Sequence, residues 1–156
     1  MKYILFFLII VYNAALYAAN YNITLANNLD HAVFVKVIGE YGWTCQCNKV
    51  KVEAHTLMPV CHIPIIPVLY GRHISQRFEK GKIFITSTVD ENSLATIEYK
   101  MMTQRLTHTI NFPKLLDSSL PKITFFLAGP CYDKECNENE NGELYILLDK
   151  YPNIIQ

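Results

Sequence analysis

The chain has 156 residues with 14 basic and 14 acidic side chains, so nothing in its overall charge attracts nucleic acid or an anionic membrane. Its length suits one domain with a core of its own and would be cramped for two. Any partner must therefore be recognised by a local surface.

The first residues have the layout of a secretory signal peptide. Lys2 precedes an apolar run that extends to Tyr12, and small residues then accumulate up to Ala19. The uninterrupted run of about ten residues is too short for a membrane-spanning helix, which needs about 20. We expect residues 1–18 to be cleaved, leaving one domain over 19–156 that is secreted or periplasmic and not stably inserted in a membrane.

After the signal, short segments rich in β-branched and aromatic residues mostly alternate between apolar and polar positions. These segments predict about eight strands, at residues 22–26, 32–38, 49–53, 82–88, 95–101, 106–112, 122–128 and 143–149. Turn-forming residues separate most of them. The pattern predicts an all-β fold with little helix, an antiparallel β-sandwich or an open barrel.

Three parts of this pattern carry a more specific expectation. In 49–53 the valines share one face and the charges the other, so this strand should have one face on the core and one in water. The two hairpins within 82–112 should form a meander of three neighbouring strands. Segments 122–128 and 143–149 are apolar on both faces and should lie centrally in a sheet.

Proline sets the expectation for two other segments. Residues 58–71 contain three prolines, the first of them Pro59, and proline cannot donate to a strand ladder. This segment should therefore follow an extended or edge path. Further along, Pro113 could start a helix of one or two turns and Pro121 could stop it.

Five cysteines follow the signal: Cys45, Cys47, Cys61, Cys131 and Cys136. An exported chain favours disulfides, and the spacing of Cys131 and Cys136 suggests a local bridge. Cys45 and Cys47 should not pair with each other, because one intervening residue would give a strained ring. Cys61 should therefore pair with one of them, closing a loop of roughly 14 to 16 residues and contributing about 3 kcal/mol.

The same region also contains the soft ligands that copper(I) or zinc prefers. They are Cys45, Cys47, His55, Met58 and Cys61, with His62 beside them. Their spacing matches no established metal motif, and an extended backbone would direct Cys61 and His62 to opposite sides. We favour the disulfide scaffold, without a metal or other cofactor, and keep an exported metal-binding protein as the alternative.

Catalytic patterns are weaker. The sequence has no GxSxG nucleophile elbow, and the one cysteine left over from the group around Cys61 is the only candidate nucleophile. His108 shares its strand parity with Ile110 and reads as a core or sheet-face residue. The carboxylates of Asp90 and Glu91 read as turn residues. We assign no catalytic residues, lean against an enzyme, and keep a small hydrolase as the third possibility.

By elimination the sequence favours a binding protein whose loops meet a protein or a glycan outside the cytoplasm, and not nucleic acid. Tyr41 and Trp43 are predicted to lie in a turn where their rings could stack on a sugar or anchor a partner, although for Trp43, the only tryptophan, we favour packing in the core or at the end of a sheet. The charged stretches 72–82 and 133–143 should be solvated loops. Asn22 heads a glycosylation sequon, which matters only in a eukaryotic or viral protein.

Overall fold

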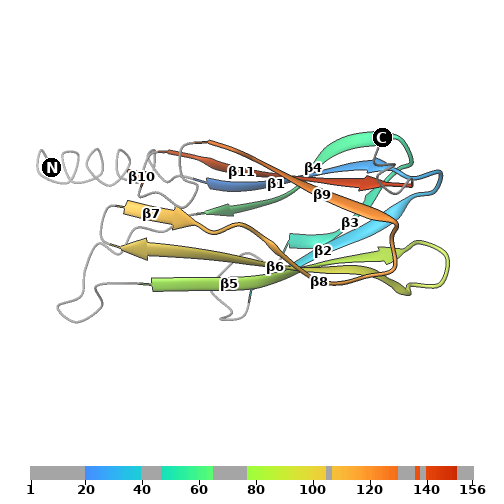
Figure 1. Ribbon diagram of the computed structural model, residues 1–156, viewed down its shortest axis with the longest axis horizontal. Helices are drawn as coiled ribbons and strands as arrows, with labels where there is room; N and C mark the ends of the chain where they lie inside the picture. The colour runs from blue at the N-terminus through green and yellow to red at the C-terminus, as the bar shows by residue number, and fades with distance from the viewer. Residues whose placement is uncertain are drawn as a thin grey trace, which may run out of the picture.

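The structure is a computed structural model that describes residues 20–39, 47–64, 77–104, 107–129, 136–137 and 140–150. Throughout these ranges the regular elements are strands, and they form two sheets that pack face to face (Figure 1). The expected all-β sandwich is confirmed. Among the described residues, no helix is long and apolar enough to cross a membrane.

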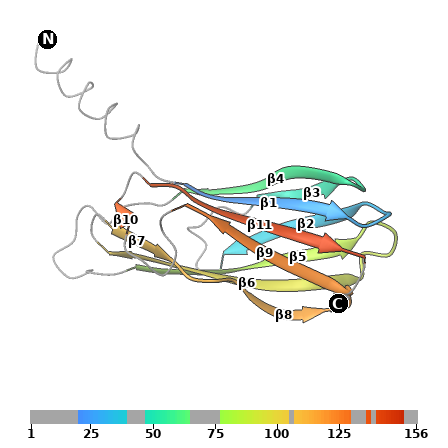
Figure 2. The ribbon, with the colours of Figure 1, turned by 45° about the horizontal axis from the view of Figure 1, so that its top comes forward.

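The smaller sheet has four strands and contains both the first and the last strand of the fold. Its order is β4 (Thr56–Pro64), β1 (Asn20–Asn28), β11 (Gly142–Asp149) and β9 (Lys122–Ala128). β1 pairs with β11 in parallel, in a continuous register that starts at Tyr21 opposite Gly142. Among the described strands, the pairings are antiparallel except at this pair, where the first and the last of these strands meet (Figure 2).

The larger sheet has seven strands. Its order is β10 (Cys136–Asn137), β7 (Thr107–Ile110), β6 (Ser93–Gln104), β5 (Arg77–Ser87), β2 (Val33–Gly39) and β3 (Cys47–Val52), and β8 (Lys114–Ser118) also pairs with β6. β5, β6 and β7 are antiparallel neighbours, so the predicted meander is confirmed. In β3, Val52 is fully buried and Lys51 is exposed, as the alternation predicts.

The core lies between the sheets and takes every second residue of each strand. β2 contributes Val33, Val35 and Val37, and β11 contributes Leu144, Ile146 and Leu148. The rings of Tyr21 and Tyr99 meet across the core with 6.2 Å between their centroids. Gly81 lies opposite Tyr99 in the ladder, and a Cβ at this glycine would come within 2.3 Å of the Tyr99 side chain, so any other residue would force that ring to move.

The helix expected between Pro113 and Pro121 is wrong, because Lys114–Ser118 forms strand β8. This short segment pairs with β6, and the amide of Ser119 extends the pairing by donating to the carbonyl of Leu94 at 2.9 Å. A helix of one or two turns gains few internal hydrogen bonds for the ordering that it requires. Pairing with an existing strand satisfies more backbone groups.

Two predictions concerned sheet edges. The proline-bearing β4 lies at an edge, as expected, and its register shifts where Pro59 and Cys61 flank one extra residue. β11 lies inside its sheet, but β9 lies at the other edge, so its predicted central position is wrong. The prediction assumed that a strand with apolar residues on both faces is covered on both faces. In β9 the outer face is not covered, and Phe126 on that face is 54% exposed.

Candidate functional site

Several residues predicted to bind or to form disulfides lie outside the described residues. These are Tyr41, Trp43, Cys45 and Cys131, together with the signal at 1–18. Cys47 and Cys136 are described by their backbone positions, as the first residues of β3 and β10. Cys136 pairs in the ladder with His108 of β7. The roles proposed for these residues stay predictions.

Cys61 lies on the inner side of β4, where its side chain is 3% exposed, and it is disulfide-bonded. Its partner is not among the described side chains, so pairing with Cys45 or Cys47 stays a prediction. The neighbouring His62 is exposed, and its Nδ1 lies 2.8 Å from the side-chain oxygen of Asn22. Cys61 and His62 thus face opposite ways, as an extended backbone requires.

The described members of the metal alternative do not converge. His55 occupies the turn before β4, and its Nε2 lies 3.3 Å from the carboxylate of Asp30. Met58 packs against the core from further along β4. At about 3.3 Å per strand residue, His55 and Cys61 lie on the order of 20 Å apart. One ion cannot bind both, and the described residues contain no cluster of three potential metal ligands.

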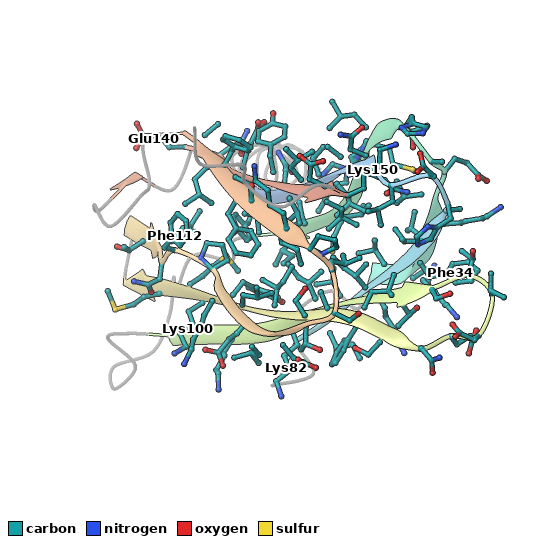
Figure 3. The ribbon with its side chains drawn as sticks, turned by 45° about the vertical axis from the view of Figure 1, so that its right-hand side comes forward. Phe34, Lys82, Lys100, Phe112, Glu140 and Lys150 are labelled. Atoms are coloured by element: carbon teal, nitrogen blue, oxygen red, sulfur yellow. The ribbon has the colours of Figure 1, made fainter. Side chains whose placement is uncertain are left out.

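Most of the chain's lysines gather instead on the outer side of the larger sheet, a surface that we call the lysine face. They are Lys36, Lys49, Lys51, Lys80, Lys82, Lys100 and Lys114, from β2, β3, β5, β6 and β8. They reach one face because lysine occupies the strand positions that alternate with buried ones, as Lys82 does with Ile83. Lys82 and Lys100 both project away from the smaller sheet (Figure 3).

Glu98 lies at the centre of the lysine face. Its carboxylate oxygens lie 3.1 Å from the ammonium groups of Lys80 and Lys100. Lys82 of β5 and Lys114 of β8 are its ladder partners on either side. Hydrogen bonds from Lys80 and Lys100 lower the pKa of Glu98. The carboxylate is therefore ionised at neutral pH and holds two ammonium groups in place.

Two lysines at the β3 side of the face also have carboxylate partners. Lys49 is ion-paired with Glu91 in the β5–β6 turn, and its ammonium lies 4.2 Å from the centre of the Phe34 ring. Lys51 pairs with Glu53 at 2.8 Å. All four charged groups are substantially exposed, so these pairs stabilise the fold only weakly.

Lys36, Lys82 and Lys114 have no carboxylate within ion-pairing distance among the described residues. Lys82 and Lys114 are separated by one strand, β6, which places their backbones about 10 Å apart. The lysine face therefore presents ammonium groups without bound carboxylates at regular strand spacings. This arrangement can bind several anionic groups at once.

The sequence prediction missed this surface. Residues 72–82 were expected to be a solvated loop, but residues 77–82 belong to β5 and include Lys80 and Lys82. The available signal was the alternation of lysine with valine in 49–52 and of lysine with glycine and isoleucine in 80–83. That alternation identifies an outer face for each strand, but not that the strands lie in one sheet.

A second charged group lies at one end of the sandwich, where Asp30 accepts hydrogen bonds from Lys150 at 2.9 and 3.1 Å. These contacts lower the pKa of Asp30, and the nearby His55 adds to the effect. The group joins the β1–β2 turn to the end of β11 and to the β3–β4 turn. We interpret these contacts as structural, because they connect the turns at this end of the sandwich.

No protein-family model matches this sequence, and no curated protein is significantly similar to it. The fold and the surface chemistry therefore carry the functional argument. They define a small β-sandwich with a basic outer sheet face.

Proposed function

We propose that this protein is an exported binding protein and that its lysine face binds an anionic glycan. The observation that carries the proposal is the position of Lys36, Lys82 and Lys114, which have no carboxylate partner among the described residues. Lys82 and Lys114 flank the ion-paired Glu98, and Lys36 lies on the same face two strands away, on β2. Strands hold the backbone of these residues in place, so binding does not need to order it.

A polymer suits this surface better than a small anion. The whole chain has no net charge, so attraction comes from the face itself and extends only about 10 Å at 0.1 M salt. A sulfated or carboxylated polysaccharide carries anionic groups along its length and can contact several ammonium groups together. Each contact is weak in water, and affinity comes from their number.

The predicted export signal favours a glycan over nucleic acid, because anionic polysaccharides are the polyanions of cell surfaces and extracellular material. Apolar side chains on the same face, such as Phe34 and Phe84, provide surface for sugar rings. The segment with Tyr41 and Trp43 lies outside the described residues. It connects β2 to β3 in sequence, and both strands carry lysines of the face. An aromatic contact from that segment would extend the same site.

The test uses heparin as the sulfated glycan and compares three single variants of the full chain after export. Lys82→Ala and Lys114→Ala remove ammonium groups without breaking an ion pair. Lys122→Ala, on β9 of the smaller sheet, is the matched control with the same change in charge. Affinity is measured by calorimetry over a range of salt concentrations.

We expect Lys82→Ala and Lys114→Ala each to weaken heparin binding roughly fivefold and to reduce the slope of log affinity against log salt by roughly 1. Lys122→Ala should change neither value. Equal losses in all three variants, or no binding by the parent protein, would overturn the proposal. Tighter binding to duplex DNA or to anionic vesicles than to heparin would replace the glycan with that partner.

A further inference from the structure

The edges of the two sheets are protected unequally. An unpaired edge can pair with another strand, and proteins prevent this with proline, lysine, bulges or short strands. In the larger sheet, β3 carries Lys49 and Lys51, and β8 carries Lys114 and Asp117. The strands β3 and β8 also pair with an irregular register, and β10 is only two residues long. In the smaller sheet, β4 carries Pro59 beside a register shift.

β9 has none of these protections along most of its length. Its seven residues, KITFFLA, contain no proline and a single charge, at Lys122. Its register with β11 is unbroken from Lys122 opposite Asp149 to Ala128 opposite Glu143. Among the described strands, none pairs with its other side. β9 starts beside the end of β8 and runs diagonally along the side of the sandwich (Figures 1 and 2).

Exposed apolar side chains accompany this edge. Phe126 on β9 is 54% exposed, and Phe112, just before β8, is 58% exposed and meets the Phe125 ring edge-on at 6.0 Å. Leu115 and Leu116 of β8 are 39% and 42% exposed. Most of the large apolar residues exposed in the described chain therefore lie along one side.

We propose that β9 pairs with β9 of a second copy of this chain, antiparallel and centred on Phe125, so that two four-stranded sheets become one sheet. In this register Lys122 meets Ala128, so no like charges oppose one another. Thr124 meets Phe126 on the outer face, and Ile123 meets Leu127 toward the core. The strand is complementary to itself, which favours a second copy over an unrelated strand.

The pairing has a consequence for the lysine face. The twofold axis of an antiparallel strand pair runs perpendicular to the sheet, so both larger sheets lie on the same side of the joined sheet. The two lysine faces then point in the same direction, and a polymer that spans both binds more tightly than one that contacts a single face. The pairing itself does not depend on the proposed glycan binding.

The test measures the mass of the exported protein by sedimentation equilibrium over a range of concentrations. Phe126→Lys puts a charge on the exposed side of β9, and Leu57→Lys is the matched control, because Leu57 is 63% exposed on the opposite edge strand of the same sheet. Hydrogen exchange of the β9 amides is followed in the same samples.

We expect a dimer whose dissociation constant rises at least about tenfold in Phe126→Lys and is unchanged in Leu57→Lys. Exchange of the β9 amides should slow as the protein concentration increases. A monomer at every concentration would overturn the proposal. A dimer that is insensitive to Phe126→Lys, with no concentration-dependent protection of β9, would also do so.

Discussion

Replacing Asn27 by alanine should remove the hydrogen bonds that connect two turns at one end of the sandwich and so destabilise the fold. The Asn27 side chain is 1% exposed, and its amide nitrogen donates to the carbonyl oxygens of His31 at 2.9 Å, Glu53 at 3.1 Å and Val52 at 3.3 Å. Its oxygen accepts a hydrogen bond from the amide of Leu29 at 3.1 Å. One side chain thus joins the β1–β2 turn to the β3–β4 turn.

The size of the effect follows from what the alanine variant leaves behind. The carbonyl of Val52 and the amide of Leu29 belong to buried residues and would lose these partners. Each buried group that loses its partner costs about 1–3 kcal/mol. We expect Asn27→Ala to lower the free energy of unfolding by about 3–4 kcal/mol, a large part of the roughly 5–15 kcal/mol typical of a domain.

Urea unfolding followed by circular dichroism measures this loss. The comparison is valid if the slope of the unfolding free energy against urea concentration is the same in both proteins. Asn28→Ala is the matched control, since Asn28 is exposed and makes one side-chain hydrogen bond, to Asp149 at 3.3 Å. It should cost less than about 0.5 kcal/mol. A loss in Asn27→Ala no greater than that in Asn28→Ala would show that Asn27 does not join the turns.

Three other substitutions test the core, the lysine face and the disulfide. Gly81→Ala should cost about 1–3 kcal/mol in urea unfolding, because its Cβ would overlap the buried Tyr99 ring; unchanged stability would mean that the ring moves aside readily. Its ion pairs lower the pKa of Glu98 below the ordinary value of 4.5. These ion pairs therefore stabilise the fold at pH values above 4.5, and their contribution is lost as the pH falls through the lowered pKa. Glu98→Gln should remove this part of the pH dependence of the unfolding free energy. The same dependence on pH in the variant and in the parent would contradict the prediction. Cys61→Ser should cost about 2–4 kcal/mol in thermal unfolding, and reduction of the parent protein should cost at least as much, because it would also open the predicted Cys131–Cys136 bridge; a variant as stable as the parent would show that the disulfide of Cys61 does not stabilise the fold.

Strand alternation predicted the fold class because it depends on local burial. β3 shows it clearly, with Val52 buried and Lys51 exposed. Pairing between distant segments was not predictable in this way. The parallel pairing of β1 with β11 and the edge position of β9 depend on which apolar faces meet, and many strand orders satisfy the same alternation. β8 was missed because pairing with β6 outweighed its local pattern.

The lysine face illustrates the same limit. The outward position of Lys82 follows from its place beside Ile83, but its approach to Glu98 and Lys114 depends on the order of β5, β6 and β8. The cysteines were assigned from spacing and the expected compartment. That reasoning selected Cys61 for a disulfide but could not choose its partner.

Lysine acetylation with and without heparin, read by mass spectrometry, tests the central claim most directly. The account predicts that bound heparin protects Lys36, Lys82 and Lys114 from acetylation, while Lys122 on the smaller sheet reacts at an unchanged rate. Protection that is uniform over all lysines, or that is greatest at Lys122, would contradict binding at the lysine face.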